Sequence, residues 1–217
     1  MELKTQRLIL RPWHLMDAED LYKYAQDELV ALPAGWQPHT SVEYSRGIID
    51  TVFCVPETYA VCLQKDKKAI GCIGFHRNDL AKEDDEYELG YWLGREFWGQ
   101  GIIPEASREI LRHAFEDLKM NRIWCGYYEG NEKSRRVQEK LGFVYQKRTE
   151  GIKVIPLNEI RTGYSSLMTK ERWQKVELFL KQKKTLDTFL QNGAITCAQY
   201  NKSFGDLIVL MDMQGVE

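Results

Sequence analysis

A glycine-rich turn in the middle of the chain has the residue types of an anion-binding site. Residues 97–106 read F-W-G-Q-G-I-I-P-E-A and lie between a strand-like apolar run and an amphipathic helical pattern. Gly99 and Gly101 allow a ligand to approach the backbone, and the free N–H groups and dipole of a helix N-terminus bind anions without a basic side chain. A diphosphate fits this turn, although a tight strand-to-helix connection with no ligand fits it as well. The P-loop pattern G-x-x-x-x-G-K-[ST] and the third glycine of a dinucleotide-binding fingerprint are both missing.

Hydrophobic periodicity predicts the elements that hold this turn. Residues 86–93 form a β run before it, and a helix with one apolar face starts near residue 103. Further strands are predicted at 7–11, 58–63, 69–76, 121–128, 143–148 and 161–168, further helices after Asp17 and over 42–53 and 131–141, and loops over 32–39 and 77–85. We therefore expect a mixed α/β (α+β) domain over residues 1–170, whose mostly antiparallel sheet has about seven strands and is flanked by helices.

The chain becomes lysine-rich and helical after residue 170. Residues 171–217 are expected to form a small helical C-terminal appendage, which is too short to hold a core of its own. It must therefore dock on the domain or on another chain, which leaves a homodimer possible.

Composition and charge narrow the classes of function. The 217 residues include 30 Lys and Arg against 32 Asp and Glu, so a net charge of -2 gives no broad attraction to nucleic acid or to anionic membranes. The five cysteines have no C-x-x-C spacing and the four histidines are scattered, so we expect a reducing compartment and no metal. No signal peptide or spanning apolar stretch is visible, and a cytoplasmic protein is expected.

Four spaced blocks carry a resemblance to one family. They are T-x-R-L-x-L-R-P-W at 5–13, E-L-G-Y-W-L at 88–93, the glycine turn, and N-x-x-S-x-x-V-x-x-K-L-G-F at 131–143. Together they resemble the Rim-type branch (RimJ/RimL-like) of the GNAT acetyltransferases, whose best-known members acetylate ribosomal proteins. The resemblance covers about residues 3–170. It implies a GNAT fold, with a sheet that splays where the pantetheine arm of acetyl-CoA inserts.

The resemblance also implies which residues bind coenzyme A. The backbone amides of the turn would bind its pyrophosphate, the end of the preceding strand would hydrogen-bond the pantetheine as an added strand does, and an asparagine would bind the pantetheine arm or the region of the acetyl group. In this chain the implied cofactor-binding residues are Trp92, Leu93, Trp98, Gly99, Gln100, Gly101, Ile102, Ile103 and Asn131. The chain departs from the wider superfamily at Ile103, where Gly or Ala is commoner, and at Gln138, where many members have a tyrosine that protonates the thiolate.

Two residues are candidates for the catalytic proton transfers. An amine attacks a thioester only when it is neutral, so a base must remove its proton, and Glu88 is the candidate because strand alternation places it on one face with Trp92. An ion-paired role for Glu88, a base at Glu86, or a mechanism of proximity alone remain open. Ser134 resembles the serine proposed as general acid in this branch. A local helix-start role for Ser134, and Tyr127 or Tyr128 as the acid, are the alternatives.

These observations predict an enzyme that moves an acetyl group from acetyl-CoA to a primary amine in a direct ternary complex. The acceptor is expected to be a protein N-terminus. One alternative is a small amine such as an antibiotic, a polyamine or an amino acid, and another is a module that binds acyl-CoA without catalysis.

Overall fold

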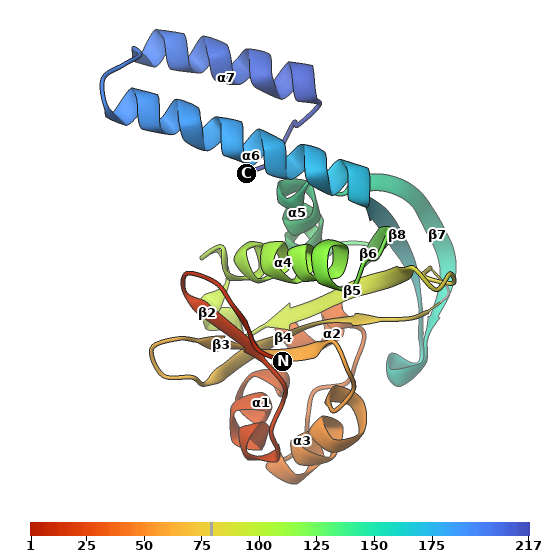
Figure 1. The fold of residues 1–217 in the computed structure, drawn as a ribbon. Helices are drawn as coiled ribbons and strands as arrows, with labels where there is room; N and C mark the ends of the chain where they lie inside the picture. The colour runs from red at the N-terminus through yellow and green to blue at the C-terminus, as the bar shows by residue number, and fades with distance from the viewer. Residues whose placement is uncertain (79) are drawn as a thin grey trace.

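A single eight-stranded sheet organises the computed structural model, which describes residues 1–78 and 80–217 (Figure 1). Position 79, in the loop expected over 77–85, lies outside the described residues. The strands are β1 (Leu3–Lys4), β2 (Leu8–Arg11), β3 (Thr58–Leu63), β4 (Ala69–His76), β5 (Glu86–Leu93), β6 (Arg122–Tyr128), β7 (Val144–Val154) and β8 (Glu159–Thr169). Their spatial order is β1-β2-β3-β4-β5-β6-β8-β7, and only the β5–β6 pair is parallel. The expected mixed, mostly antiparallel sheet is confirmed.

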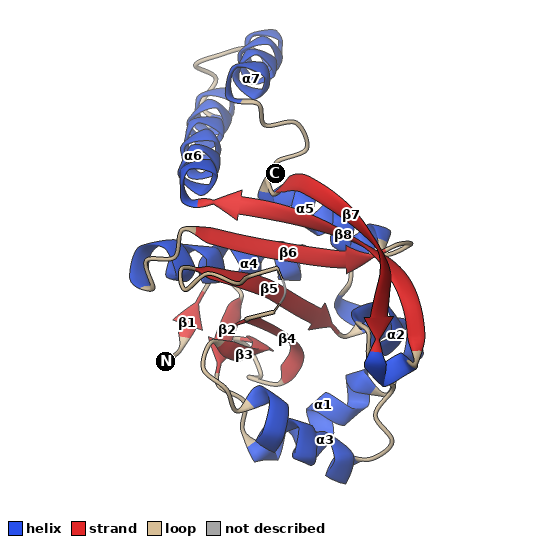
Figure 2. Ribbon diagram, turned by 90° about the vertical axis from the view of Figure 1, so that its right-hand side faces the viewer, coloured by secondary structure: helices blue, strands red, loops and turns tan. Residues whose placement is uncertain are grey.

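Helices cover both faces of the sheet. They are α1 (Ala18–Ala25), α2 (Glu28–Ala34), α3 (Val42–Ile48), α4 (Ile102–Arg112), α5 (Glu132–Leu141), α6 (Lys170–Gln191) and α7 (Cys197–Met211). Figures 1 and 2 show α4 and α5 on one face and α1 and α3 on the other. The central strand β4 is buried at every position except His76, as a strand covered on both faces must be.

The parallel pair β5–β6 is short, and this opens the sheet. Pairing joins Glu86–Glu88 to Arg122–Trp124 and goes no further, although both strands continue. Beyond Glu88 one edge of β5 therefore has no neighbouring strand from β6, while its other edge stays paired with β4 as far as Leu93.

The structure differs from the expectation in the segment after α1. Helix α2 occupies residues 28–34, where a loop was expected from residue 32. Asp27 caps the helix by accepting a hydrogen bond from the Leu29 N–H, and Gly35 ends it in a left-handed conformation. Pro33 lies inside this short helix, where it cannot donate the helical hydrogen bond to the Leu29 carbonyl, and proline usually indicates a loop. The sheet has eight strands instead of about seven because the two-residue β1 is too short to produce a periodic signal.

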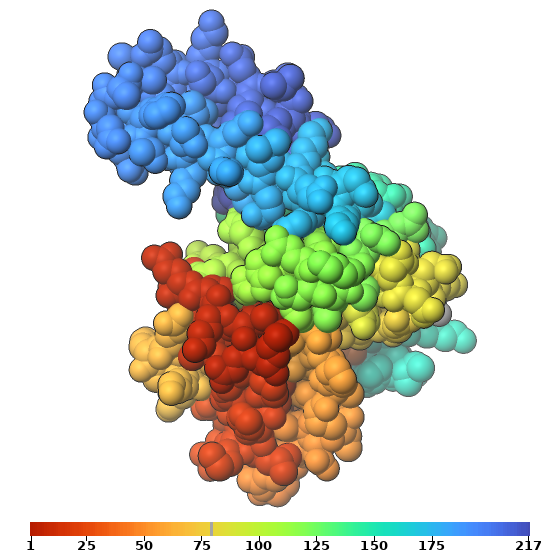
Figure 3. Space-filling view, viewed as in Figure 1, coloured from red at the N-terminus to blue at the C-terminus, as the bar shows by residue number. Residues whose placement is uncertain are grey.

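Helices α6 and α7 form a hairpin that extends away from the sheet (Figures 1 and 3). Their small apolar cluster comprises Val176, Phe179, Met211, Met213 and Val216. Trp173, in the first turns of α6, stacks on Phe115 and belongs to the main core. In the part of the chain that the structure describes, no helix is long and apolar enough to cross a membrane.

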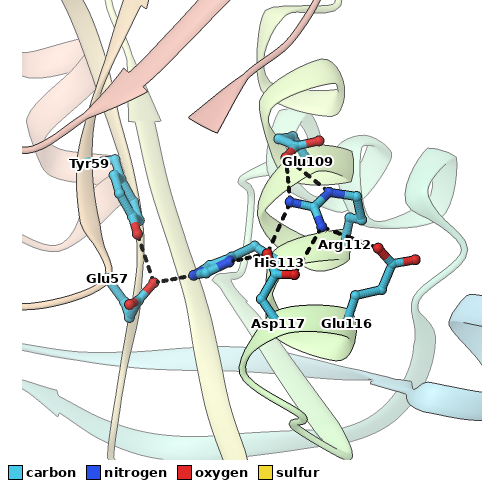
Figure 4. Close-up of polar contacts among 7 residues, drawn as sticks. All are labelled: Glu57, Tyr59, Glu109, Arg112, His113, Glu116 and Asp117. Atoms are coloured by element: carbon cyan, nitrogen blue, oxygen red, sulfur yellow. Dashed lines mark hydrogen bonds and ion pairs between the residues drawn. The ribbon is translucent and has the colours of Figure 1, made fainter. Parts of the chain in front are cut away.

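A buried histidine ties the end of α4 to the start of β3 (Figure 4). The His113 side chain is 2% exposed, its Nε2 lies 3.0 Å from Glu57 Oε2, and its Nδ1 lies 2.8 Å from Asp117 Oδ2. The Tyr59 hydroxyl donates to the same Glu57 oxygen at 2.8 Å. Hydrogen bonds from His113, which has the larger effect, and from Arg112 lower the pKa of Asp117.

This cluster predicts a pH-dependent contribution to stability. A carboxyl whose pKa is lowered by folding stabilises the protein above its unfolded pKa, and the effect is lost as the pH falls through the folded pKa. We therefore expect Asp117→Asn to lower the free energy of unfolding at pH 7. The difference from the wild type should begin to shrink near the unfolded pKa of about 4 and vanish only below the lowered folded pKa. Urea unfolding at a series of pH values from 7 downwards measures this. Glu116→Gln is the control, since among residues 1–78 and 80–217 Glu116 pairs only with Arg112, at the surface. An equal loss in both variants would contradict the prediction.

Candidate active site

Glu88 lies where β5 and β6 separate. It is the last residue of β5 that pairs with β6, opposite Trp124. Its side chain is 13% exposed, and a Cβ built on Gly126 of β6 would lie only 2.9 Å from Glu88 Oε1. The Asn78 amide donates to Glu88 Oε2, and His76 Nε2 lies 3.6 Å from the same oxygen. The carboxylate therefore borders the opening between the strands, and neighbouring polar groups orient it.

Glu86, the alternative base, has both carboxylate oxygens engaged. Arg122 Nη1 donates to Oε1 at 3.0 Å, and the Trp124 indole donates to Oε2 at 3.4 Å. The side chain is 5% exposed. A buried carboxylate held in this way has a structural role, so the geometry favours Glu88 over Glu86 as a base.

The glycine turn meets α4 with its backbone in the left-handed region. Gly99 has φ 75° and Gly101, the N-cap residue, has φ 72°. Apart from its two chain neighbours, no described residue has an atom within 4 Å of a Cβ built on Gly99, so the turn is open to a ligand there. Ile102 and Ile103 begin the helix with buried side chains, and both therefore face the core while their amides lie in its first turn.

The carbonyls of the last two residues of β5 face different neighbours. The Trp98 indole donates to the Leu93 carbonyl at 2.8 Å, and Lys133 of α5 lies over the Trp98 ring, 3.5 Å from its centroid. The Trp92 carbonyl instead faces β4, because a Cβ on Gly71 would lie 2.5 Å from it. The Trp92 ring packs against Trp13 and Trp36 at centroid distances of 6.3 and 6.1 Å.

Ser134 contacts a tyrosine of β5. The Asn131 side chain caps α5 by accepting a hydrogen bond from the Ser134 N–H at 3.2 Å. The Ser134 hydroxyl lies 2.9 Å from the Tyr91 hydroxyl. Burial raises the pKa of Tyr91 well above its usual value, so Tyr91 keeps its proton and can donate to Ser134. Since alternate residues of a strand face opposite ways, Glu88 and the Tyr91–Ser134 pair lie on opposite faces of β5.

The other aromatic candidates have separate partners. Tyr127 stacks on Tyr164 of β8 with ring centroids 5.2 Å apart. Tyr128 lies under the Arg161 guanidinium at 5.2 Å and against Gly35. The Gln138 side chain is buried, and its amide atoms have no hydrogen-bond partner among the described residues. Within the described residues, no group of three or more His, Cys, Asp or Glu is arranged to hold a metal ion.

Contacts distant in sequence complete the site. Arg161 Nη1 donates to the Leu32 carbonyl at 2.6 Å, which joins β8 to α2. Sequence patterns did not indicate this contact or the Tyr91–Ser134 pair, because their partners lie 129 and 43 residues apart. The only local signal was Tyr91 itself, in the E-L-G-Y-W-L block.

Comparisons with known proteins agree with this geometry. Residues 7–144 match the family described as "Acetyltransferase (GNAT) domain". The chain is 37% identical to "Putative ribosomal N-acetyltransferase YdaF" of Bacillus subtilis over 110 residues, which are 50% of this chain and 58% of that protein. It is 30% identical to "Uncharacterized N-acetyltransferase p20" of Bacillus licheniformis, over 65% of this chain and 81% of that one. A crystal structure of a GNAT-family acetyltransferase from Bacillus anthracis superposes with a TM-score of 0.68 at 25% identity, covering 79% of this chain and 99% of that chain.

Proposed function

This chain belongs to the GNAT acetyltransferase family, and we propose that it is an acetyl-CoA-dependent N-acetyltransferase that acts on a primary amine. The observation that carries the proposal is the position of Glu88, a nearly buried carboxylate at the vertex where β5 and β6 separate. The name of its Bacillus subtilis relative favours a protein N-terminus as acceptor over a small amine. We assign the activity to residues 1–170 and treat 171–217 as an appendage.

The residues around the gap fit coenzyme A. The amides of Gly99, Gln100, Gly101, Ile102 and Ile103 would hold its diphosphate, because the turn is left-handed at both glycines and open at Gly99. The Trp98 N–H, expected to take part, instead donates to the Arg95 carbonyl at 3.2 Å. The edge of β5 that β6 leaves free between Glu88 and Leu93, together with Asn131, would hold the pantetheine arm. Trp92 was expected to hydrogen-bond this arm as well, but its carbonyl faces β4. When bound, acetyl-CoA supplies the acetyl thioester.

Glu88 would accept the proton of the attacking amine, directly or through a water molecule. His76 and Asn78 hold its carboxylate in place, and carboxylates at such positions are suited to act as bases. Direct transfer is favoured over a covalent enzyme intermediate, because the nearby thiols are poor nucleophiles. Burial raises the pKa of Cys72 to about 12. Burial, and to a smaller extent the charge of Glu88, also raise the pKa of Cys125.

Ser134 would donate a hydrogen bond to the leaving thiolate. The Tyr91 hydroxyl holds the Ser134 hydroxyl in place. Position 138, where many members of the wider superfamily have the tyrosine that protonates the thiolate, is a glutamine here. Because a thiolate leaves easily, Ser134→Ala should lower kcat only about tenfold, the worth of one hydrogen bond to a charged group. The dissociation constant of coenzyme A should not change. Steady-state kinetics with calorimetry measure both, and an unchanged kcat would remove Ser134 from the mechanism.

The function itself is tested by the release of coenzyme A thiol. Purified protein is incubated with acetyl-CoA and with peptides that differ in their N-terminal residue, alongside a panel of polyamines, amino acids and aminoglycosides. Turnover with peptides supports the proposed acceptor, and turnover only with small amines changes it. Binding of coenzyme A without turnover of any amine would indicate a non-catalytic module.

A further inference from the structure

The N-terminal T-x-R block lies against the glycine turn and the start of α4. Arg7 Nη1 donates to the Gln100 carbonyl at 3.0 Å, and Arg7 Nε donates to Glu105 Oε2 at 2.6 Å. The backbone N–H of Arg7 and the hydroxyl of Thr5 both donate to Glu105 Oε1. Arg7, which lies just before β2, thus joins the N-terminal block to the glycine turn and to the first helical turn of α4. About ninety residues of chain separate these partners.

The bond to Gln100 fixes the direction of a neighbouring amide. Gln100 lies between the two left-handed glycines, and its carbonyl shares a planar trans peptide unit with the Gly101 N–H. In a trans unit these two groups point in opposite directions. Holding the carbonyl on Arg7 therefore turns the Gly101 N–H to the side away from the guanidinium.

The ion pair with Arg7 compensates the negative charge of Glu105 beside the glycine turn. Burial alone would raise the pKa of Glu105, but hydrogen bonds from Thr5 and Arg7 reverse this and lower it. Glu105 is therefore a carboxylate in the first turn of α4, where it would repel a bound diphosphate. The guanidinium at 2.6 Å cancels much of that repulsion.

We propose that Arg7 is a positioning residue for the diphosphate subsite, where it orients the Gly101 amide and neutralises Glu105. This inference rests on the proposed function, because the subsite is that of coenzyme A. It gives the T-x-R block a physical role in ligand binding, although the block lies outside the turn itself.

The test is Arg7→Gln, with the binding of coenzyme A measured by calorimetry. We expect the dissociation constant and the KM for acetyl-CoA to rise about tenfold, the cost of losing charge-assisted bonds, and kcat at saturating acetyl-CoA to stay unchanged. The calorimetric stoichiometry reports the competent fraction of each preparation, so partial unfolding does not imitate the effect. Arg112→Gln is the matched control, because Arg112 forms similar ion pairs at the other end of α4.

A double variant distinguishes the proposed roles of Arg7 from a general disruption of the fold. Arg7→Gln combined with Glu105→Gln should bind coenzyme A more tightly than Arg7→Gln alone, because the uncompensated carboxylate is removed. The proposal is overturned if Arg7→Gln leaves the dissociation constant unchanged, or if the second substitution weakens binding further. If the wild type binds no coenzyme A, the proposed function fails instead, so the two failures are distinguishable.

Discussion

Replacing Glu88 with glutamine is expected to lower kcat at least about a hundredfold, the usual contribution of a positioned general base. Glutamine keeps the size of the side chain and its contact with Asn78, but it cannot accept the proton of the amine. The dissociation constant of coenzyme A should stay within about twofold of the wild type, because the turn that holds the diphosphate lies at the other end of β5. Stopped-time assays of thiol release and calorimetry measure the two quantities.

Glu86→Gln is the matched control for Glu88→Gln. Both residues lie on the same face of β5, two positions apart, but Glu86 is held by Arg122 and Trp124. We expect Glu86→Gln to lower the midpoint of thermal unfolding and to leave kcat per folded molecule near the wild-type value. If Glu88→Gln retained full turnover, the amine would have to arrive already deprotonated, and proximity alone would account for the rate.

The local parts of the fold and of the site were predictable from the sequence. The glycine turn, the amphipathic face of α4 and the face of β5 that carries Glu88 each depend on residues within one strand or one helix, and periodicity describes such segments well. The capping role of Asn131 belongs to the same class, because it depends on residues three positions apart. The opening between β5 and β6 came from the family resemblance instead, since no periodicity indicates where two paired strands separate.

The parts that the sequence did not predict depend on contacts between distant residues or on competing local signals. Tyr91 reaches Ser134 and Arg7 reaches Gln100 only after the sheet has formed. Helix α2 was missed because Pro33 and Gly35 are typical of loops, whereas in this chain they occupy the last turn and the C-cap of a capped helix. Strands β7 and β8 run beyond their predicted ends because they pair with each other there, although Glu150 and Gly151 interrupt the strand pattern of β7.

Gly101→Val is expected to raise the dissociation constant of coenzyme A about a hundredfold, which corresponds to two lost hydrogen bonds to a charged group. A β-branched residue does not tolerate the positive φ of this N-cap, so the turn must rotate and the amides must move with it. The value of kcat at saturating acetyl-CoA should change little, because Gly101 takes no part in the proton transfers assigned to Glu88 and Ser134. Calorimetry and the ratio of KM to kcat measure this.

Gly193→Val is the control for the backbone strain that valine causes at a positive φ. Gly193 has φ 69°, and in the described part of the chain only its own neighbours approach within 4 Å of a Cβ built on it. The same substitution therefore imposes the same backbone cost between α6 and α7. Both variants should lose about 1–2 kcal/mol of stability, but only Gly101→Val should weaken the binding of coenzyme A. Equal binding by both variants would mean that the amides of the turn do not hold the diphosphate. The role proposed for Arg7 would then fail with it, because both the orientation of the Gly101 amide and the neutralisation of Glu105 serve that subsite.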